Sequence, residues 1–202
     1  MKIIAIHAFI ITIFLVSIWC FLLKNGQAAE KNSQTKYKIE DIIYSNKFDG
    51  CFYCSRTQKR GNDALKELLT LSKKKDISHI NVFNLFRTRT SDEGLLYLKN
   101  FNHISELYLG SNKITNRGLS YLSDLQNLSK LELSLTDISD EGLFYLKDLK
   151  NLSELRLGGT AIIGKGLIYL KELPNLSTID LTLSRISDEN LVYLKDLPNL
   201  SE

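Results

Sequence analysis

The sequence predicts an α/β solenoid, in which short parallel strands line the inside of a curve and short helices cover the outside. The first observation is a strict repeat. The chain can be written in rows of 24 residues with no insertion or deletion, and the rows begin at Phe101, Leu125, Leu149, Leu173 and Leu197. Repetition at a period of 20–50 residues is typical of stacked arrays. The second observation is that each row contains two apolar patterns, one typical of a strand and one of a helix.

The row that begins at Leu149 shows both patterns. Its first half has the spacing L-x-x-L-x-L over Leu152–Leu157, and the last two leucines fall on the same side of a short strand. In its second half, Leu167, Leu170 and Leu173 are three residues apart, which keeps them near one face of a short helix. One such unit cannot bury both apolar stripes alone, so stacked neighbours must cover them.

A polar column follows the strands and identifies the repeat type. It comprises Thr88, Asn112, Thr136, Thr160 and Ser184, whose side chains can satisfy backbone groups that the turn leaves unpaired. The resulting pattern LxxLxLxxTxI resembles the leucine-rich repeat. The second half, SDEGLxYLKDL, resembles the convex segment of ribonuclease-inhibitor-like repeats, and the whole phrase is similar to bacterial, planctomycete-type arrays. The resemblance covers residues 77–202, with the last repeat incomplete, and implies a generic binding scaffold.

The helix starts carry hydroxyl and acidic residues at fixed positions. We expect four hydroxyl residues to cap free N–H groups, namely Ser91, Thr115, Ser139 and Ser187. An acidic residue follows three of them, where negative charge favours a helix N-terminus. Ile163 and the Gly164-Lys165 pair interrupt both columns, so we expect this helix start to be the weakest in the array.

Two further columns recur with the repeat. The first comprises Tyr97, Tyr121, Tyr145, Tyr169 and Tyr193, which we interpret as packing between neighbouring helices with the hydroxyl at the rim. An exposed aromatic stripe for a partner or glycan is the alternative. The tripeptide NLS, formally a glycosylation acceptor, recurs at Asn127, Asn151, Asn175 and Asn199, and we interpret it as a consequence of the repeat.

The strands are predicted to form the inner, concave face. Parallel strands repeat about every 4.8 Å and packed helices need roughly 8–10 Å, so the array bends around the strands. One outward column then comprises Val82, Glu106, Lys130, Glu154 and Thr178, and the next comprises Asn84, Tyr108, Glu132, Arg156 and Asp180. Opposite charges adjoin in both columns, so we expect them to pair across strands, which argues against a highly charged ligand.

This face supplies the candidate binding residues. They are Tyr108 with Phe86 and Arg87 beside it, together with Glu132 and Arg156 of the same surface. Aromatic residues and Arg are enriched where binding energy concentrates. Small residues form a lane next to them, at Gly110, Ser134, Gly158 and Thr182. We therefore predict that an unidentified protein partner binds here.

The N-terminal residues 1–28 are predicted to be a signal peptide or an N-terminal membrane anchor. Residues 3–23 carry no formal charge and reach the roughly 20 residues that span a bilayer, although a signal core usually has only about 7–15. Gly26 and Ala28 fit a cleavage site before Ala29. Both interpretations predict export to the periplasm, the cell surface or the medium, and the anchor adds membrane association through residues 3–23.

A basic linker with a C-x-x-C pair is predicted for residues 29–61. Residues 30–75 carry 11 Lys and Arg against 6 Asp and Glu, a net charge of +5, whereas residues 76–202 carry 13 against 17, a net charge of −4. In an exported protein Cys51 and Cys54 favour a disulfide, with each other or between chains. A zinc site lacks paired further ligands, and a thiol–disulfide catalyst lacks the expected βαβ context. Residues 62–76 are predicted to form an amphipathic capping helix over the first strand.

The sequence favours a binding or scaffold module and not an enzyme. It contains no nucleophile–His–acid grouping, no phosphate loop and no cluster of metal ligands, so we expect no cofactor and no metal. The export signal and the net negative array oppose nucleic-acid binding. One alternative is an anchored structural element that self-assembles through an open C-terminal edge, because LPNLSE ends where a strand is due. A minor alternative is thiol–disulfide activity at Cys51 and Cys54.

Overall fold

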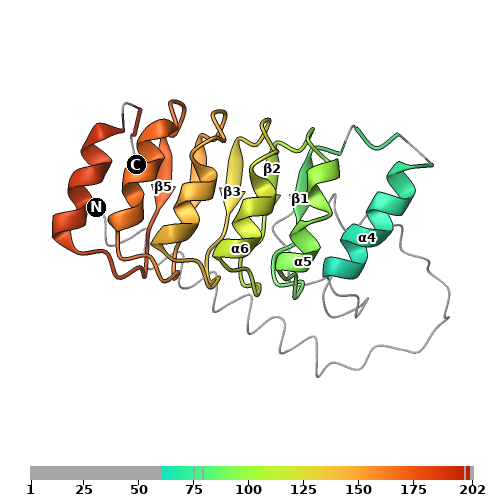
Figure 1. The fold of residues 1–202 in the computed structure, drawn as a ribbon, viewed down its shortest axis with the longest axis horizontal. Coiled ribbons are helices and arrows are strands. Elements are labelled where there is room, and N and C mark those ends of the chain that lie inside the picture. The colour runs from blue at the N-terminus through green and yellow to red at the C-terminus, as the bar shows by residue number, and fades with distance from the viewer. Residues whose placement is uncertain (1–60, 75, 79, 198, 201–202) are drawn as a thin grey trace, which may run out of the picture. The chain divides into compact units, whose positions relative to one another are not determined.

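The repeats form one row, with short strands on one side and short helices on the other. The computed structural model describes residues 61–74, 76–78, 80–197 and 199–200. In Figure 1 the helices stand side by side in front of the strands, from α4 in teal to the last repeat in red. This arrangement confirms the predicted α/β solenoid.

The strands are three residues long and form one parallel sheet in chain order. They are β1 (Val82–Asn84), β2 (Glu106–Tyr108), β3 (Lys130–Glu132), β4 (Glu154–Arg156) and β5 (Thr178–Asp180). Each pairs with the next at an offset of one repeat, as in Leu107 opposite Leu131 and Tyr108 opposite Glu132. Both outward columns predicted from the sequence are therefore confirmed.

The helices are short and mostly of the 3₁₀ type. They are α4 (Gly61–Ser72), α5 (Asp92–Leu95), η1 (Leu98–Asn100), α6 (Asn116–Leu119), η2 (Ser120–Leu122), η3 (Asp140–Leu146), η4 (Lys165–Glu172) and η5 (Asp188–Asp196). A 3₁₀ helix has three residues per turn, so side chains three apart eclipse each other. The spacing of Leu167, Leu170 and Leu173 matches this turn better than the 3.6 residues of an α-helix, and all three leucines are fully buried.

One continuous core runs through the repeats and includes the leading helix. Leu65 and Leu68 of α4 belong to the same buried cluster as Phe83 of β1 and the leucines of the later repeats. Phe83 packs against Phe101 with ring centroids 5.3 Å apart. The main contacts of α4 are with α5, so this helix continues the row of helices, whereas the sequence placed it over the first strand.

The polar column at the strand exits satisfies the turn backbone, as expected, and Asn112 does so most fully. Its amide donates to the carbonyl oxygens of Leu85 (2.7 Å), Leu109 (2.7 Å) and Gly110 (3.2 Å), and its Oδ1 accepts from the Thr90 N–H at 3.0 Å. Asn112 thus joins two consecutive turns. The threonines of the column each donate once, to the carbonyl three residues before them.

The predicted hydroxyl caps are mostly wrong. Only Thr115 accepts a bond at the start of its own helix, from the Arg117 N–H at 3.3 Å. Ser91 and Ser139 instead donate to the glutamates two residues further on, and Ser187 caps no N–H group of its helix. The oxygens of Ser91 and Ser139 in turn accept from the side-chain amides of Asn62 and Asn116 in the preceding element, so they are already used.

The residue after three of these positions, Asp92, Asn116 or Asp140, binds the next repeat. Asp92 accepts from the N–H and the hydroxyl of Thr115, at 2.9 and 2.6 Å. Asn116 accepts from the Ser139 N–H at 2.9 Å. A side chain of the preceding repeat thus binds the residue before α6 and the residue before η3, and these contacts hold consecutive repeats together.

The same kind of contact between repeats contradicts the expected weak helix start at Gly164. Asp140 of the preceding repeat accepts from the N–H groups of Ile163 (2.9 Å), Gly164 (3.0 Å) and Gly166 (2.6 Å). Gly164 has φ +110°, a left-handed backbone that glycine adopts without strain. The missing local cap is thus replaced by three bonds from a neighbour.

The asparagines of the NLS tripeptides also join repeats. Each donates from its side-chain amide to a backbone carbonyl about one repeat earlier, as Asn151 does to Gln126 at 2.7 Å and Asn127 does to Asn102 at 2.8 Å. This contact gives a structural reason for their recurrence. In the tyrosine column, Tyr97, Tyr121 and Tyr193 pack against the core as expected, whereas Tyr145 and Tyr169 are exposed.

Several sequence predictions fall on residues that the structure does not describe. The signal peptide or anchor, the basic linker and the Cys51–Cys54 pair lie outside the described residues. Among the helices that are described, none combines the length and the apolar character needed to cross a bilayer.

Candidate functional site

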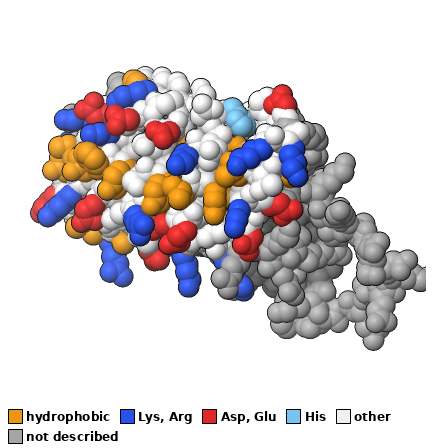
Figure 2. Space-filling model, turned by 45° about the vertical axis from the view of Figure 1, so that its right-hand side comes forward, with side chains coloured by type: hydrophobic (Ala, Val, Ile, Leu, Met, Phe, Trp, Pro, Cys, Tyr) orange, Lys and Arg blue, Asp and Glu red, His pale blue; other side chains and the backbone are white. Residues whose placement is uncertain are grey.

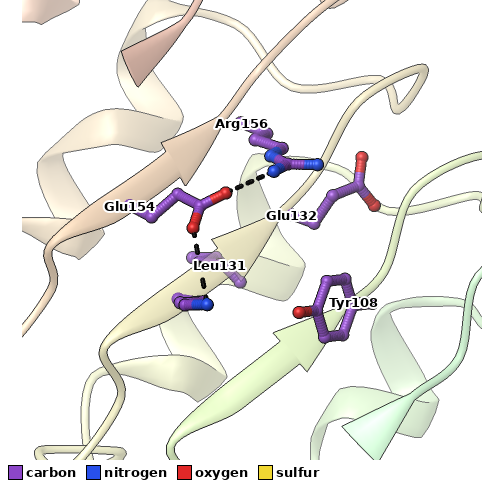
Figure 3. Close-up of a pocket in the computed structure, with 6 residues that line it drawn as sticks. Tyr108, Leu131, Glu132, Glu154 and Arg156 are labelled. Carbon is purple, nitrogen blue, oxygen red and sulfur yellow. Dashed lines mark ion pairs between the residues drawn. The ribbon is translucent and has the colours of Figure 1, made fainter. Parts of the chain in front are cut away.

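The outward side chains of the five strands form the surface on which the predicted binding residues lie. We call it the strand face and define it by the first and third residues of each strand, β1 to β5. A shallow hollow lies at its centre, spanning β2, β3 and β4 (Figure 3). The hollow is lined by Tyr108, Lys130, Leu131, Glu132, Glu154 and Arg156.

The charges in the hollow pair with one another. Lys130 Nζ lies 3.8 Å from Glu106 Oε1 and 3.8 Å from Glu154 Oε2. Arg156 Nη2 lies 2.5 Å from the other oxygen of Glu154, so Glu154 has a cation on each side (Figure 3). The contacts of Lys130 confirm the expected pairing across strands in the first column. In the second column the expectation is wrong, because Arg156 pairs with Glu154 of its own strand. The hollow therefore has no strong charge of one sign with which to attract an ion.

Tyr108 presents its ring in this hollow. Its hydroxyl donates to Glu106 Oε2 at 2.7 Å. Partial burial, and then the hydrogen bond to Glu106 and the negative charges of Glu106 and Glu154, raise the pKa of Tyr108 to about 12, although Arg156 opposes the shift. The phenol is therefore protonated at every physiological pH. It acts as a neutral aromatic group whose hydroxyl hydrogen is already bound to Glu106.

Glu132 has a bracing role that the sequence did not reveal. Only 8% of this residue is exposed, and its carboxylate accepts from the N–H groups of Gly110 at 2.8 Å and Ser134 at 2.9 Å. A Cβ on Gly110 would lie only 2.3 Å from one carboxylate oxygen, so the absence of a side chain there makes room for Glu132. Glu132 thus holds two turns in place beneath the hollow.

The role of the third strand residue alternates from one strand to the next along the sheet. Asn84 accepts from the Phe86 N–H at 3.1 Å, and Asp180 accepts from the Thr182 N–H at 2.9 Å, each two residues ahead. The third residues of β1, β3 and β5 thus brace their own turns, whereas β2 and β4 present Tyr108 and Arg156 at this position. An acceptor residue two positions before the turn, in alternate rows only, is the sequence signal that could have shown this.

Phe86 and Arg87 lie apart from the hollow, although the sequence grouped them with Tyr108. They follow β1, and neither lines the hollow. The Arg87 guanidinium carbon lies 5.8 Å from the centroid of the Phe86 ring. The Arg87 N–H donates to the Gly110 carbonyl at 3.0 Å, and its φ of 57° places it in a column of left-handed turn residues. The strand face therefore brings together three of the five predicted residues.

Within the residues that the structure describes, no three or more His, Cys, Asp or Glu side chains are grouped so that they could hold a metal ion.

Comparison with known families agrees with this geometry. The family model described as "Leucine Rich repeat" matches residues 102–123 and 124–147, two consecutive units that contain β2, β3 and their helices. The two matched units are leucine-rich repeats, and the chain has the leucine-rich repeat fold. The finer resemblance to ribonuclease-inhibitor-like and planctomycete-type repeats is not tested by this match and stays a prediction.

A solved structure shares this fold. An internalin from Listeria monocytogenes, InlF, is 23% identical with a TM-score of 0.52, over 62% of this chain and 35% of the internalin. The chain thus spans about a third of the length of that neighbour. Internalin C2 of the same organism is 20% identical with a TM-score of 0.35, over 86% of this chain and 99% of the internalin. No curated protein matches the sequence significantly.

Proposed function

We propose that this chain is an exported protein that binds a protein partner through its strand face, with the contact centred on Tyr108 and Arg156. Leucine-rich repeat proteins generally act in protein binding, which supports the class of function. The export part rests on the uncharged segment 3–23 of the sequence. The proposal for the contact rests on the strand face itself.

One observation carries the choice of residues. At the third position of the strands, β1, β3 and β5 use their side chains to brace turns, whereas Tyr108 and Arg156 leave the turn backbone alone and line the hollow. They stand on β2 and β4, on either side of Glu132. Tyr and Arg are also the residue types that most often dominate binding energy.

The electrostatics of the hollow define the kind of partner. Because Lys130, Glu154 and Arg156 already form ion pairs, a strongly charged ligand would have to break these contacts. A partner that covers the Tyr108 ring and the aliphatic stem of Arg156 keeps them intact. The hollow is shallow, whereas sites for small molecules enclose most of their ligand. A side chain that protrudes from a folded protein surface fits it better.

The first experiment captures the partner from its native compartment. A photo-crosslinking phenylalanine analogue replaces Tyr108 in the full chain, and products are identified by mass spectrometry. The partner is then purified and its affinity measured by calorimetry. We expect Tyr108→Ala to weaken binding about 10- to 30-fold, as truncation of a central contact does. Arg156→Ala should act in the same direction.

The matched control lies on the same face. Thr178→Ala removes an outward side chain from β5, outside the hollow, and should change affinity less than about twofold. If the variant that combines Tyr108→Ala and Arg156→Ala binds the captured partner as tightly as the parent, the strand face is not the binding site and the proposal fails.

A further inference from the structure

The helix side of the last three repeats carries a continuous strip of exposed apolar side chains. We call it the aromatic belt, and it comprises Phe144, Tyr145, Ile168, Tyr169 and Val192, which are 37–49% exposed. Figure 2 shows hydrophobic side chains in a row across this side of the molecule, with a larger group toward the C-terminal repeats. Exposed apolar patches of this kind mark interaction sites.

The belt is ordered by contacts between neighbouring helices. Phe144 of η3 meets Tyr169 of η4 edge-to-face, with ring centroids 5.4 Å apart and an interplanar angle of 85°. Phe144 also meets Tyr145 edge-to-face at 5.7 Å. The rings thus bridge two repeats and present a rigid surface. The second repeat has Ser120 in the column of Phe144 and Ile168, so the fold does not require an apolar residue there.

A charged row of alternating sign runs along one edge of the belt. Lys147, the C-cap of η3, and Asp148 directly after it stand three residues beyond Phe144 and Tyr145. Lys147 Nζ lies 3.9 Å from the Phe144 ring centroid. The same order of charges recurs in η4, where Lys171 and Glu172 stand three residues after Ile168 and Tyr169. In the described part of the chain, Asp148, Lys171 and Glu172 form no ion pair with one another.

We propose that the aromatic belt binds the aromatic belt of a second copy of this chain, in a two-fold symmetric pair. A row of alternating charge has no net attraction for an anionic membrane or a uniformly charged protein, but a two-fold rotation places the lysines of one row against the carboxylates of the other. The same surface patch then serves on both copies. This contact lies on the opposite side from the strand face, so it is independent of the proposed function.

The area of the belt is consistent with such a pair. Taking about 200 Å² for each side chain, the exposed fractions leave about 400 Å² of apolar surface per copy. Two belts therefore remove about 800 Å² from water, and the flanking charged rows bring the total near the ~1,200 Å² at the lower limit of specific interfaces. We expect a reversible dimer with a Kd on the order of 10 μM.

The test uses the full chain in a mild detergent, with a photo-crosslinking phenylalanine analogue in place of Tyr169. We expect irradiation to give a covalent product of twice the 23.1 kDa chain mass. The same analogue at Tyr108 should give none. Phe144→Ser combined with Ile168→Ser should lower the yield at least tenfold, and Leu135→Ser, an exposed leucine outside the belt, should leave it unchanged.

Charge reversal provides a second test that does not depend on apolar substitutions. A chain with Lys147→Glu and Lys171→Glu should cross-link poorly with itself, and so should a chain with Asp148→Lys and Glu172→Lys. Mixing the two should restore the product, because each reversed lysine then faces a reversed carboxylate.

The proposal is overturned by any of the following results. These are no dimer product from position 169, an equal product from position 108, a yield that the paired serine substitutions do not change, and charge-reversed chains that fail to rescue each other. Capture of lipid or of a foreign protein at position 169 in place of a second copy would also overturn it.

Discussion

Replacing Asp140 by Ala should destabilise the array more than any other single loss of a carboxylate at a helix start. The carboxylate accepts from the N–H groups of Ile163, Gly164 and Gly166, all in the next repeat. Ile163 is exposed, so water replaces its bond, but Gly164 and Gly166 are buried. The substitution therefore removes two bonds to a charged acceptor that water replaces poorly.

The magnitude follows from these two bonds. A hydrogen bond to a charged group contributes about 1.5–3 kcal/mol, and loss of a helix cap costs about 0.5–2 kcal/mol. Because the Asp140 side chain is half-buried, we take the lower values and expect a loss of about 3 kcal/mol in the free energy of unfolding. Asp140→Asn keeps one acceptor oxygen and should lose about half of this.

Urea unfolding measures the effect. With a slope of about 2 kcal/mol per molar urea, a loss of about 3 kcal/mol moves the midpoint down by about 1.5 M. Hydrogen exchange gives a local readout, because the amides of Gly164 and Gly166 should lose protection first. Repeat arrays can unfold in parts, so the two measurements are needed together.

The same column supplies the control. Asp188 stands at the equivalent position of the last repeat, its side chain is exposed, and it makes no hydrogen bond across repeats in the described residues. Asp188→Ala should cost less than about 0.5 kcal/mol. If both substitutions lowered the midpoint equally, the effect would come from helix-dipole charge alone, and the assignment of Asp140 as a clip between repeats would be wrong.

Three further predictions concern the turns and the strand face. Asn112→Ala should cost about 3–4 kcal/mol in urea unfolding, because a buried amide that makes four hydrogen bonds is lost, and a cost below about 1 kcal/mol would contradict that role. Gly110→Ala should lower the free energy of unfolding by about 1–2 kcal/mol, because the new Cβ displaces the Glu132 carboxylate. Gly158→Ala is the control and should cost less, since its Cβ would meet Thr182 Oγ1 at 2.9 Å. Equal costs would refute the steric argument. Because the pKa of Tyr108 is raised to about 12, the folded chain keeps a proton that the unfolded chain releases near pH 10, so stability should fall as the pH rises from about 10 to about 12. Tyr108→Phe should remove the last step of the phenolate absorbance titration, and a titration complete by pH ~11 would contradict the raised pKa.

The sequence by itself determined the architecture and the composition of the strand face. An uninterrupted period of 24 residues sets the offset between neighbouring strands, so Tyr108 had to lie beside Glu132 and Glu132 beside Arg156. The three-residue spacing of the leucines also set which face of each helix is buried, although it did not distinguish the α-helical starts α5 and α6 from the 3₁₀ helices of the later repeats. Regular apolar periodicity decides these features because the core is shared by every repeat.

Only the tertiary structure decided which groups each polar side chain binds. The sequence placed Asp140 at the start of its own helix, but its carboxylate reaches the backbone of the next repeat. It placed Glu132 among binding residues, but the carboxylate accepts from two turns. No pattern in the sequence singled out Phe144, whereas the structure exposes it beside Tyr169. A hydrogen bond or ring contact between repeats joins residues about 24 positions apart in the sequence. The stacking of the repeats sets the distance between them. A linear pattern of residue types carries no such distance.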